Sequence, residues 1–320
     1  MDLSIIIPVY NAKEHLAQTL GSVLSQESVF SFEIVAVDDG SVDSSPEILA
    51  LFAGKAAEKG ISLRWERQEN RGPAAARNRG LELARGDTIL FLDADDRLMP
   101  EAVSSLLSEK KRRGASILLF DSVLSYPDGR REPFPACERE AGFLSEEEYM
   151  LSLPCPWNKL FDRSLFADPR LRFPEGILYE DLALIPALGS GKAGAIYYDK
   201  RVFHEYVQSE HSIMRSPYSP RKRDIFRSLD HLALCVRGHE RELEYLYFSH
   251  LYLSFAWTFR EGGDTEALRE MNRLMKEKFP HWQKNPLIRG RTTRKQRLFA
   301  HLFYREHFQL IRFWKGIKKA

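Results

Sequence analysis

Short apolar runs alternate with amphipathic stretches over the first 120 residues of the chain. Four runs rich in β-branched and aromatic side chains predict buried strands at residues 4–8, 33–37, 61–65 and 88–92. Between these runs, apolar positions recur at helical spacing, most clearly over 12–25 and 72–84. Strands joined by crossover helices form a parallel sheet with right-handed connections. This part of the chain is therefore predicted to be an α/β, doubly wound domain of the nucleotide-binding type.

Helical spacing replaces this alternation after about residue 216. Apolar positions predict helices with charged outer faces over residues 221–236, 241–259 and 265–279. These helices are expected to pack beside the first part of the chain or against another subunit. We therefore expect an α/β domain of residues 1–215, with halves of about 1–120 and 121–215, then a helical extension of residues 216–288 and a tail of residues 289–320.

The tail differs from the rest of the chain in charge. The whole sequence has a net charge of +2, yet residues 289–320 hold ten Lys or Arg and a single acid, Glu306. A helix over residues 294–319 would separate an apolar face from a basic face. The apolar face holds Phe299, Phe303, Leu310, Trp314 and Ile317, and the basic face holds Arg305, Arg312, Lys315 and Lys319. Such a helix suits an anionic membrane surface or packs on the acidic remainder of the protein. Nucleic acid is a weaker candidate partner, because no known binding module is visible.

The composition is that of an ordinary globular protein, with 320 residues, 43% hydrophobic and 29% charged. No stretch approaches the roughly 18 to 20 consecutive apolar residues of a membrane-spanning helix, and the first residues lack the basic start and cleavage site of a signal peptide. The three cysteines, Cys137, Cys155 and Cys235, have no C-x-x-C spacing, which argues against a disulfide framework and a zinc site. We expect a cytoplasmic protein, with peripheral attachment to the inner face of the cell membrane left open.

Polar residues follow each predicted strand of the first half. They occupy residues 8–11, 38–41, 70–72 and 93–96. The carboxyl ends of parallel strands lie on one edge of an open sheet, and ligands bind there. A single turn of this kind would be ordinary. Four on the same edge predict a binding site.

The side chains on this edge fit a nucleotide and a cation. Tyr10 offers a ring that can stack on a base, and Asp39 a carboxylate that can accept a hydrogen bond from a base N–H. Asp93 and Asp95 can converge on one hard divalent cation, although a plain surface turn also explains them. Small residues open the helix at 72–84 and place Arg77 near its N-terminus, which favours phosphate. A solvated arginine is the alternative.

Two other motifs fit less well. Residues 189–194 match G-x-G-x-x-G, but they follow a helical pattern and precede the strand-like 195–198, the reverse of the order that dinucleotide binding requires. A haloacid-dehalogenase-like phosphoryl transfer enzyme also carries D-x-D after an apolar strand. Such enzymes usually carry the motif on their first strand, whereas here it follows the fourth. A non-catalytic sugar-nucleotide-binding module remains an alternative.

Taken in order, the polar blocks and their strands resemble glycosyltransferase family 2. The blocks are Ile5 to Asn11, Val37 to Ser41, Asn70 to Gly72 with Ala76 to Gly80, and Phe91 to Asp96. The resemblance covers about the first 215 residues. It implies a GT-A fold and inverting transfer of a sugar from a nucleotide diphosphate, with UDP favoured. It also implies a nucleotide site formed by Pro8, Tyr10, Asp39, Asn70, Arg77 and Asp93, and Mn²⁺ or Mg²⁺ held by Asp95 together with Asp93.

Two later blocks, Pro156 to Phe161 and Phe173 to Leu182, resemble the acceptor side of the same family. The resemblance assigns Asp181 as the base that takes a proton from the acceptor hydroxyl. It places Trp157, Asn158 and Glu180 on the acceptor side. His204 stands where the family often has an aromatic or basic residue, so it is either a metal or phosphate contact or a structural histidine.

The resemblance thus implies a metal-dependent hexosyl- or N-acetylhexosaminyl-transferase of the bacterial cell envelope. Its acceptor would be a saccharide hydroxyl in a cell-surface polysaccharide, a lipid-linked glycan or a teichoic-acid-type polymer. The sequence decides neither the donor sugar nor whether copies of the chain form a homo-oligomer.

Overall fold

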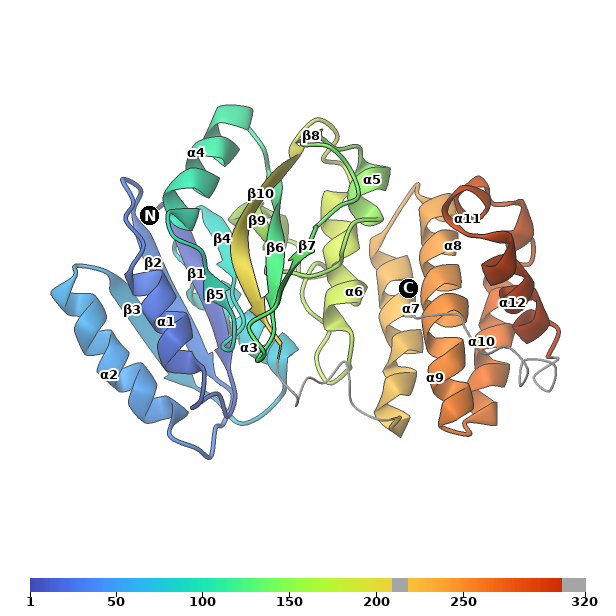
Figure 1. Ribbon diagram of the computed structural model, residues 1–320, viewed down its shortest axis with the longest axis horizontal. Helices are drawn as coiled ribbons and strands as arrows, with labels where there is room; N and C mark the ends of the chain where they lie inside the picture. The colour runs from blue at the N-terminus through green and yellow to red at the C-terminus, as the bar shows by residue number, and fades with distance from the viewer. Residues whose placement is uncertain (209–217, 307–320) are drawn as a thin grey trace. The chain divides into compact units, whose positions relative to one another are not determined.

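The computed structural model describes residues 1–208 and 218–306 (Figure 1). The chain divides into two compact units, Met1–Arg215 and Ser216–Ala320. Six residues of the predicted tail helix lie outside the described part: Leu310, Arg312, Trp314, Lys315, Ile317 and Lys319.

The first unit alternates strands and helices through its first hundred residues, as the sequence predicts. Its elements begin with β1 Leu3–Val9, α1 Leu16–Leu24, β2 Phe32–Asp38, α2 Ser45–Glu58, β3 Ser62–Arg67, α3 Pro73–Leu83, β4 Thr88–Phe91, β5 Arg97–Leu98 and α4 Ala102–Arg113. They continue with β6 Ile117–Ser125, β7 Arg131–Phe134, β8 Gly142–Phe143, α5 Glu146–Met150, β9 Lys159–Asp162, η1 Arg163–Phe166, α6 Glu180–Leu184, η2 Ile185–Gly189 and β10 Ile196–Val207.

One sheet organises this unit, in the order β3-β2-β1-β4-β9-β6-β10-β5, with β7 beside β6 and β8 beside β10. Strands β1 to β4 pair in parallel, and β10 is parallel to β6. The predicted α/β fold with a mostly parallel sheet is confirmed. The pattern did not predict β9, which runs antiparallel between β4 and β6 and joins the two halves of the sheet.

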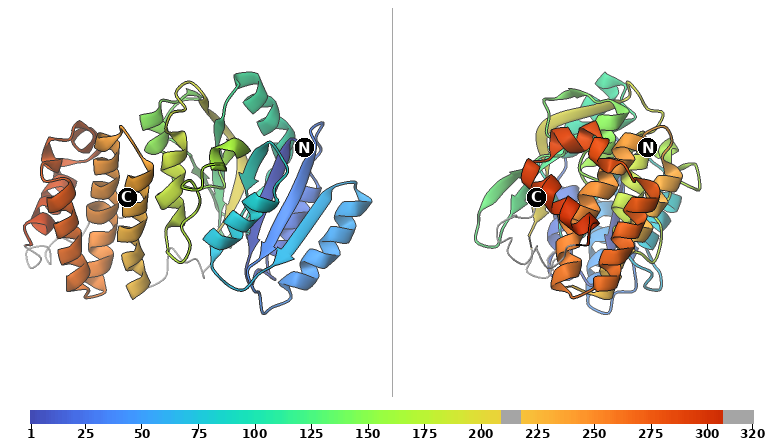
Figure 2. Two further views of the ribbon diagram at one scale, coloured as in Figure 1. Left: turned by 180° about the vertical axis from the view of Figure 1, so that it is seen from behind. Right: turned by 90° about the vertical axis from the view of Figure 1, so that its right-hand side faces the viewer.

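Both faces of the sheet are covered by helices, and β1 shows why. Ile5 and Ile7 point into a core shared with α1, α2 and α4, whereas Ile6 points into a second core shared with α3, η1 and η2. Successive side chains of a strand face opposite sides, so a strand that is buried on both faces reads as a continuous apolar run. Figures 1 and 2 show the two helical layers from opposite sides.

Helix α3 packs unusually close to the sheet because of Gly80. A Cβ atom at this position would lie 2.3 Å from Cγ2 of Ile6 on β1, so a larger side chain would push the helix outward. Close packing at Gly80 holds α3 against β1, and Arg77 of the same helix reaches Asp93 in the turn after β4, where the candidate site lies.

The second unit is helical. It contains η4 Pro220–Arg223, α7 Asp224–Cys235, α8 Glu240–Phe248, a π-helical turn Ser249–Phe255, α9 Ala256–Glu261, α10 Thr265–Lys278, η6 Trp282–Lys284, α11 Pro286–Arg291 and α12 Arg294–Tyr304. The three helical stretches expected between residues 221 and 279 are confirmed.

Helix α12 corrects the expected tail helix over 294–319, because it ends at Tyr304, two residues before the left-handed backbone of Glu306. Phe299 and Phe303 on its apolar face are buried within the second unit. Their ring centroids lie 4.7 Å apart, and Phe299 also packs on Trp257. Across residues 1–208 and 218–306, no helix is both long and apolar enough to cross a membrane.

Candidate functional site

The turn after β4 is held rigidly by the surrounding chain. The Leu92 amide continues the sheet by donating to Ile6 O at 2.9 Å, and the Thr19 hydroxyl donates to Ala94 O at 2.8 Å. Asp96 is fully buried, and its Oδ1 accepts from the Val207 amide at 2.9 Å. Asp96 therefore anchors the turn to β10.

Asp93 and Asp95 remain partly exposed at the surface of this turn. Burial raises the pKa of the Asp95 carboxyl to about 7, with further contributions from the negative charges of Asp96 and Asp93. Carboxylates crowded in this way repel one another, and a divalent cation would relieve that repulsion. Within residues 1–208 and 218–306, no group of three or more His, Cys, Asp or Glu side chains is arranged to hold a metal. Asp93 and Asp95 supply two carboxylates, so a cation bound there would need further ligands from outside these two side chains.

Asp39 lies directly after β2 and fixes the loop that leads into α3. Its Oδ1 accepts from Gln68 Nε2 at 2.7 Å and from the Arg71 amide at 2.9 Å, while Oδ2 accepts from the Gly72 amide at 2.7 Å. Oδ2 can accept one further hydrogen bond. Asp39 is 3% exposed, and in this structure it shapes the loop.

The other residues expected at the nucleotide lie on the same edge of the sheet. Pro8 is half-buried near the end of β1, and Tyr10 follows this strand with 52% of its surface exposed. Asn70 is exposed beside Gly40, where an added Cβ would lie 3.0 Å from the Asn70 amide. Gly40 has a φ of +76°. Glycine is required here because the backbone is left-handed and a side chain would come too close to Asn70.

Arg77 joins the two halves of the first unit, a contact that the sequence did not predict. Its guanidinium is buried, with Nη2 donating to Asp93 Oδ1 at 2.9 Å and Nη1 donating to Glu180 Oε1 at 2.7 Å. The charges of Asp93 and Glu180 raise the pKa of Arg77 above its ordinary value, although burial opposes them. In this structure the arginine that was expected at a phosphate bridges two carboxylates.

A second contact between the halves is made by the next residue of α3, Asn78. Asn78 Nδ2 donates to Phe173 O at 2.8 Å, and Asn78 Oδ1 accepts from the Phe173 amide at 3.0 Å. Arg71 forms an ion pair with Glu175 at 2.5 Å. Helix α3 therefore holds the segment that leads to Glu180.

Asp181 is the second residue of α6, a helix that begins directly after Tyr179. The backbone of Tyr179 is left-handed, with a φ of +64°, a conformation that costs energy for a bulky residue and is found mostly at functional sites. Burial raises the pKa of the Asp181 carboxyl to about 7; the charge of Glu180 also raises it, and that of Arg77 lowers it. A carboxylate with a pKa near 7 can accept a proton at neutral pH.

Trp157 and Asn158 form a buried wall. The Trp157 ring stacks on the His204 ring, with centroids 4.5 Å apart and planes 15° apart, and Asn158 is fully buried. Both side chains therefore support the site from inside the protein.

His204 belongs to β10, which extends well beyond the expected strand at 195–198. It is fully buried, with Nδ1 3.2 Å from Ser122 Oγ and Nε2 3.2 Å from Asp96 Oδ2. These partners fit a structural histidine better than an open ligand contact.

Tyr206 lies beside the candidate site, and the sequence pattern did not indicate it. Burial raises its pKa to about 12, and the charge of Asp96 contributes next, which places the phenol near the carboxylates. Tyr206 lies two residues after His204 on β10 and also packs on Trp157, with ring centroids 5.2 Å apart. The two-residue period of a strand could have revealed it, had the strand been extended to residue 207.

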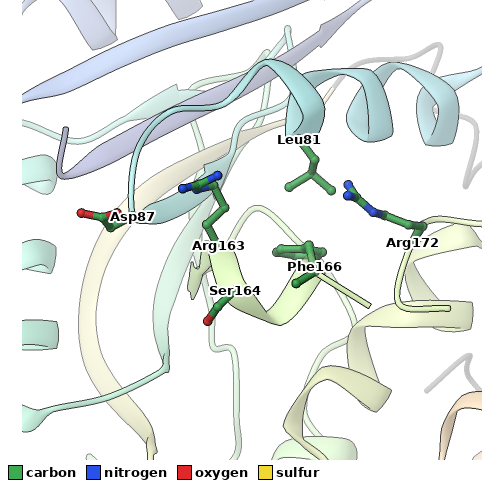
Figure 3. Close-up of a pocket in the computed structure, with 7 residues that line it drawn as sticks. Leu81, Asp87, Arg163, Ser164, Phe166 and Arg172 are labelled. Atoms are coloured by element: carbon green, nitrogen blue, oxygen red, sulfur yellow. The ribbon is translucent and has the colours of Figure 1, made fainter. Parts of the chain in front are cut away.

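A separate hollow of about 470 Å³ lies near the opposite end of β4, beside Asp87 (Figure 3). Its other lining residues are Leu81, Arg163, Ser164, Phe166, Ala167 and Arg172. None of the residues predicted for the site lines it.

Comparisons with known proteins agree with this arrangement. The family model described as glycosyl transferase family 2 matches residues 4–167, just over half of the chain. The succinoglycan biosynthesis protein ExoO of Rhizobium meliloti is 30% identical over 221 residues, which cover 62% of this chain and 60% of that protein. The poly(ribitol-phosphate) beta-glucosyltransferase of Bacillus spizizenii is 32% identical over 179 residues, which cover 55% of this chain and 27% of that protein. The chain therefore spans less than two thirds of these relatives.

Among solved structures, the crystal structure of S. aureus TarS 1-349 in complex with UDP-GlcNAc is similar, with a TM-score of 0.74. The match covers 99% of this chain and 93% of that one at 20% sequence identity. A second structure, TarS 1-349 with UDP, has a TM-score of 0.71. At this identity the likeness concerns the fold, and it confirms the GT-A architecture.

Proposed function

Because the chain belongs to glycosyl transferase family 2, we propose that it moves a sugar from a nucleotide diphosphate donor to a saccharide hydroxyl, with inversion at the anomeric carbon. The observation that carries the proposal is the convergence on Arg77. This buried guanidinium holds Asp93, from the predicted donor side, and Glu180, the neighbour of the predicted base. Family membership also makes the haloacid-dehalogenase-like alternative unnecessary.

The donor side would be formed by the edge of the sheet at β1 to β4. Tyr10 would stack on the base, Asp39 would accept a hydrogen bond from it, and Pro8 and Asn70 would line the same site. The exposed ring of Tyr10 and the remaining lone pair of Asp39 Oδ2 support this assignment. UDP is the favoured nucleotide, since the similar TarS structures contain UDP or UDP-GlcNAc.

Asp95 and Asp93 would hold a divalent cation, Mn²⁺ or Mg²⁺. When bound, such a cation supplies positive charge to the departing diphosphate. Burial and the acidic neighbours of Asp95 raise its pKa. This supports the assignment, because the negative charges of the carboxylates are not fully balanced by positive charge nearby. Asp93 also contacts Arg77, so its position depends on the acceptor half as well.

The chemical step assigns the proton to Asp181. The acceptor hydroxyl oxygen would attack the anomeric carbon from the face opposite the diphosphate, and its proton would pass to the Asp181 carboxylate. The bond from the anomeric carbon to the phosphate oxygen breaks as the new glycosidic bond forms, and the nucleoside diphosphate leaves. A pKa of about 7 for Asp181 makes this carboxylate a stronger base than an ordinary aspartate.

The acceptor is proposed to be a hydroxyl-bearing polymer or lipid-linked glycan of the bacterial cell envelope, and the transferred sugar a hexose or N-acetylhexosamine. The names of the relatives, one in succinoglycan biosynthesis and one a poly(ribitol-phosphate) glucosyltransferase, support this class.

A nucleotide-release screen over UDP-sugars, with and without Mn²⁺, tests the proposal. We expect release that depends on an acceptor, and a loss of about 10² to 10⁴ in rate in Asp181→Asn with donor binding nearly intact. Asp168→Asn is the matched control, because Asp168 is partly exposed and pairs with Arg170 away from the site. Binding of UDP without release from any donor would instead support a sugar-nucleotide-binding module, and near-normal turnover of Asp181→Asn would remove Asp181 as the base.

Peripheral attachment to the inner face of the membrane is a further part of the proposal, supported by the charge of residues 289–320. Because Phe299 and Phe303 are buried in the second unit, truncation at 288 would expose its core. Co-sedimentation of the full chain and of residues 1–306 with anionic vesicles is the better test, and equal partitioning would contradict membrane binding by residues 307–320. Sedimentation velocity on the full chain tests whether copies associate.

A further inference from the structure

Lys159, the first residue of β9, is fully buried. Its Nζ donates to Leu153 O at 2.6 Å, to Cys155 O at 2.9 Å and to Asn158 Oδ1 at 2.7 Å. An ammonium group has three N–H donors, so all three are matched. None of these three acceptors is a carboxylate, and burial lowers the pKa of Lys159 to about 8. The chain therefore places a cation in its interior to bind the oxygens of one loop.

This loop, residues 153–158, is tied to the rest of the first unit at both ends. The Leu153 amide donates to Ala136 O at 3.0 Å, and Asn158 O accepts from the Phe120 amide of β6 at 3.0 Å. Trp157, between these ties, stacks on His204 of β10. Backbone hydrogen bonds therefore fix both ends of the loop, and Lys159 Nζ binds three of its oxygens from the inside.

The same loop follows α5, whose Tyr149 hydroxyl donates to Ile185 O at 2.9 Å, in the helical turn that continues directly from α6 and Asp181. Burial raises the pKa of the Cys155 thiol, and the next contribution is the negative charge of Asp181, followed by smaller ones that include Asp93. The charge of Asp181 also acts on Lys159. Together with the Tyr149–Ile185 hydrogen bond, these charges place the loop beside the helix that carries Asp181.

An apolar side chain of similar length, such as methionine, would remove the ammonium group of Lys159. Here such a replacement would leave two backbone carbonyls and the Asn158 amide oxygen without their donor, inside a buried region where unpaired polar groups are unfavourable. The loop would relax away from its present position, and the wall beside Asp181 would change shape.

We infer that Lys159 is a positioning residue of the acceptor side, whose ammonium fixes the 153–158 loop against Asp181. This inference rests on the proposed function. Lys159 is fully buried with its ammonium bound to three oxygens of the loop, so it acts through the loop. Its loss should impair the acceptor and leave the donor site intact.

The test compares Lys159→Met with Lys110→Met in the full chain. Lys110 is also largely buried, and it pairs with Asp162 at the other end of β9. Hydrogen–deuterium exchange should rise at least tenfold at residues 153–158 in Lys159→Met and stay unchanged in β2, residues 32–38. UDP affinity by calorimetry should stay within twofold of the wild type. With UDP-glucose or UDP-GlcNAc as donor and poly(ribitol phosphate) as acceptor probe, the acceptor KM should rise tenfold or more. Lys110→Met should show none of these effects.

Unchanged exchange at residues 153–158 in Lys159→Met would overturn the inference, and so would an equal loss of UDP affinity and transfer, because that is the effect of a general structural role. If Lys159→Met does not fold, Asn158→Ala removes one of the three acceptors and should give a smaller change of the same kind. If the wild type releases nucleotide from none of the sugar donors, the proposed function is overturned. Unchanged exchange beside an active wild type would overturn the role of Lys159 alone.

Discussion

The raised pKa of Asp181 predicts that the proposed base destabilises the fold. Burial holds its pKa at about 7, against 3.8 for an ordinary aspartate. Between these two values the folded chain binds a proton that the unfolded chain has lost, so stability falls as pH rises, by about 1.4 kcal/mol per pH unit. From pH 5 to pH 8 this amounts to about 3 kcal/mol. The loss is complete above pH 7, where both states carry the charge.

Asp181→Asn removes this charge. We expect the variant to gain in Tm relative to the wild type by about 6 to 12 °C more at pH 8 than at pH 5, at about 2 to 4 °C per kcal/mol for a unit of this size. A change in packing or hydrogen bonding caused by asparagine is independent of pH and cancels in this comparison. The titration of Asp95 is present in both proteins and also cancels.

Thermal unfolding in the presence of a chelator, at pH 5 and pH 8, measures the effect. Asp168→Asn is the control, because hydrogen bonds from Arg170 lower the pKa of Asp168 to about 2, so its contribution is constant between pH 5 and pH 8. A Tm difference between Asp181→Asn and the wild type that is the same at both pH values would refute the raised pKa. Loss of transfer together with a gain in stability at pH 8 is the result expected of a strained functional residue.

Three further predictions follow from the same geometry. The rate of transfer should fall about tenfold per pH unit below pH 7, as the Asp181 carboxylate takes up a proton, and a profile flat from pH 5 to pH 8 would contradict its role as base. Gly80→Ala should lower the free energy of unfolding by about 1 to 3 kcal/mol in urea titrations, because its Cβ would meet Ile6; Gly54→Ala on α2, with nothing within 4 Å, should be stabilising by about 0.5 to 1 kcal/mol. Asp95→Asn should reduce the Mn²⁺-dependent increase in UDP affinity at least about tenfold in calorimetry, and an unchanged increase would show that the cation binds elsewhere.

The sequence predicted those parts of the fold that depend on local pattern. Strands β1, β2 and β4 are buried on both faces and read as apolar runs, and the polar turns after them gather on one edge because the strands are parallel. Position within the sheet follows from topology, which a local pattern does not contain. The four residues of β9 show no alternation that marks an antiparallel strand, yet β9 pairs with both β4 and β6 and thereby places the 153–158 loop in the site.

Contacts between distant residues were the second limit. Arg77 and Glu180 are 103 positions apart, and Asp96 and Val207 are 111 apart. The sequence indicated that Arg77 and Asp96 are charged and lie near the edge of the sheet where ligands bind. Their partners depend on how β9 and β10 are inserted, and on the close packing of α3 at Gly80.

Some residues that were predicted to contact the nucleotide are hydrogen-bonded within the protein itself, and the structure explains why. A charged group beneath a site must be hydrogen-bonded or paired if it is to remain buried, and Asp39 and Arg77 meet this requirement through the β3–α3 loop and through Asp93 and Glu180. Loss of activity in an Arg77 variant would therefore not identify a phosphate contact. UDP affinity in Arg77→Gln compared with Glu180→Gln separates the two roles. An equal effect of the two changes indicates that Arg77 acts by positioning the carboxylates, whereas a larger loss in Arg77→Gln indicates direct contact with the diphosphate.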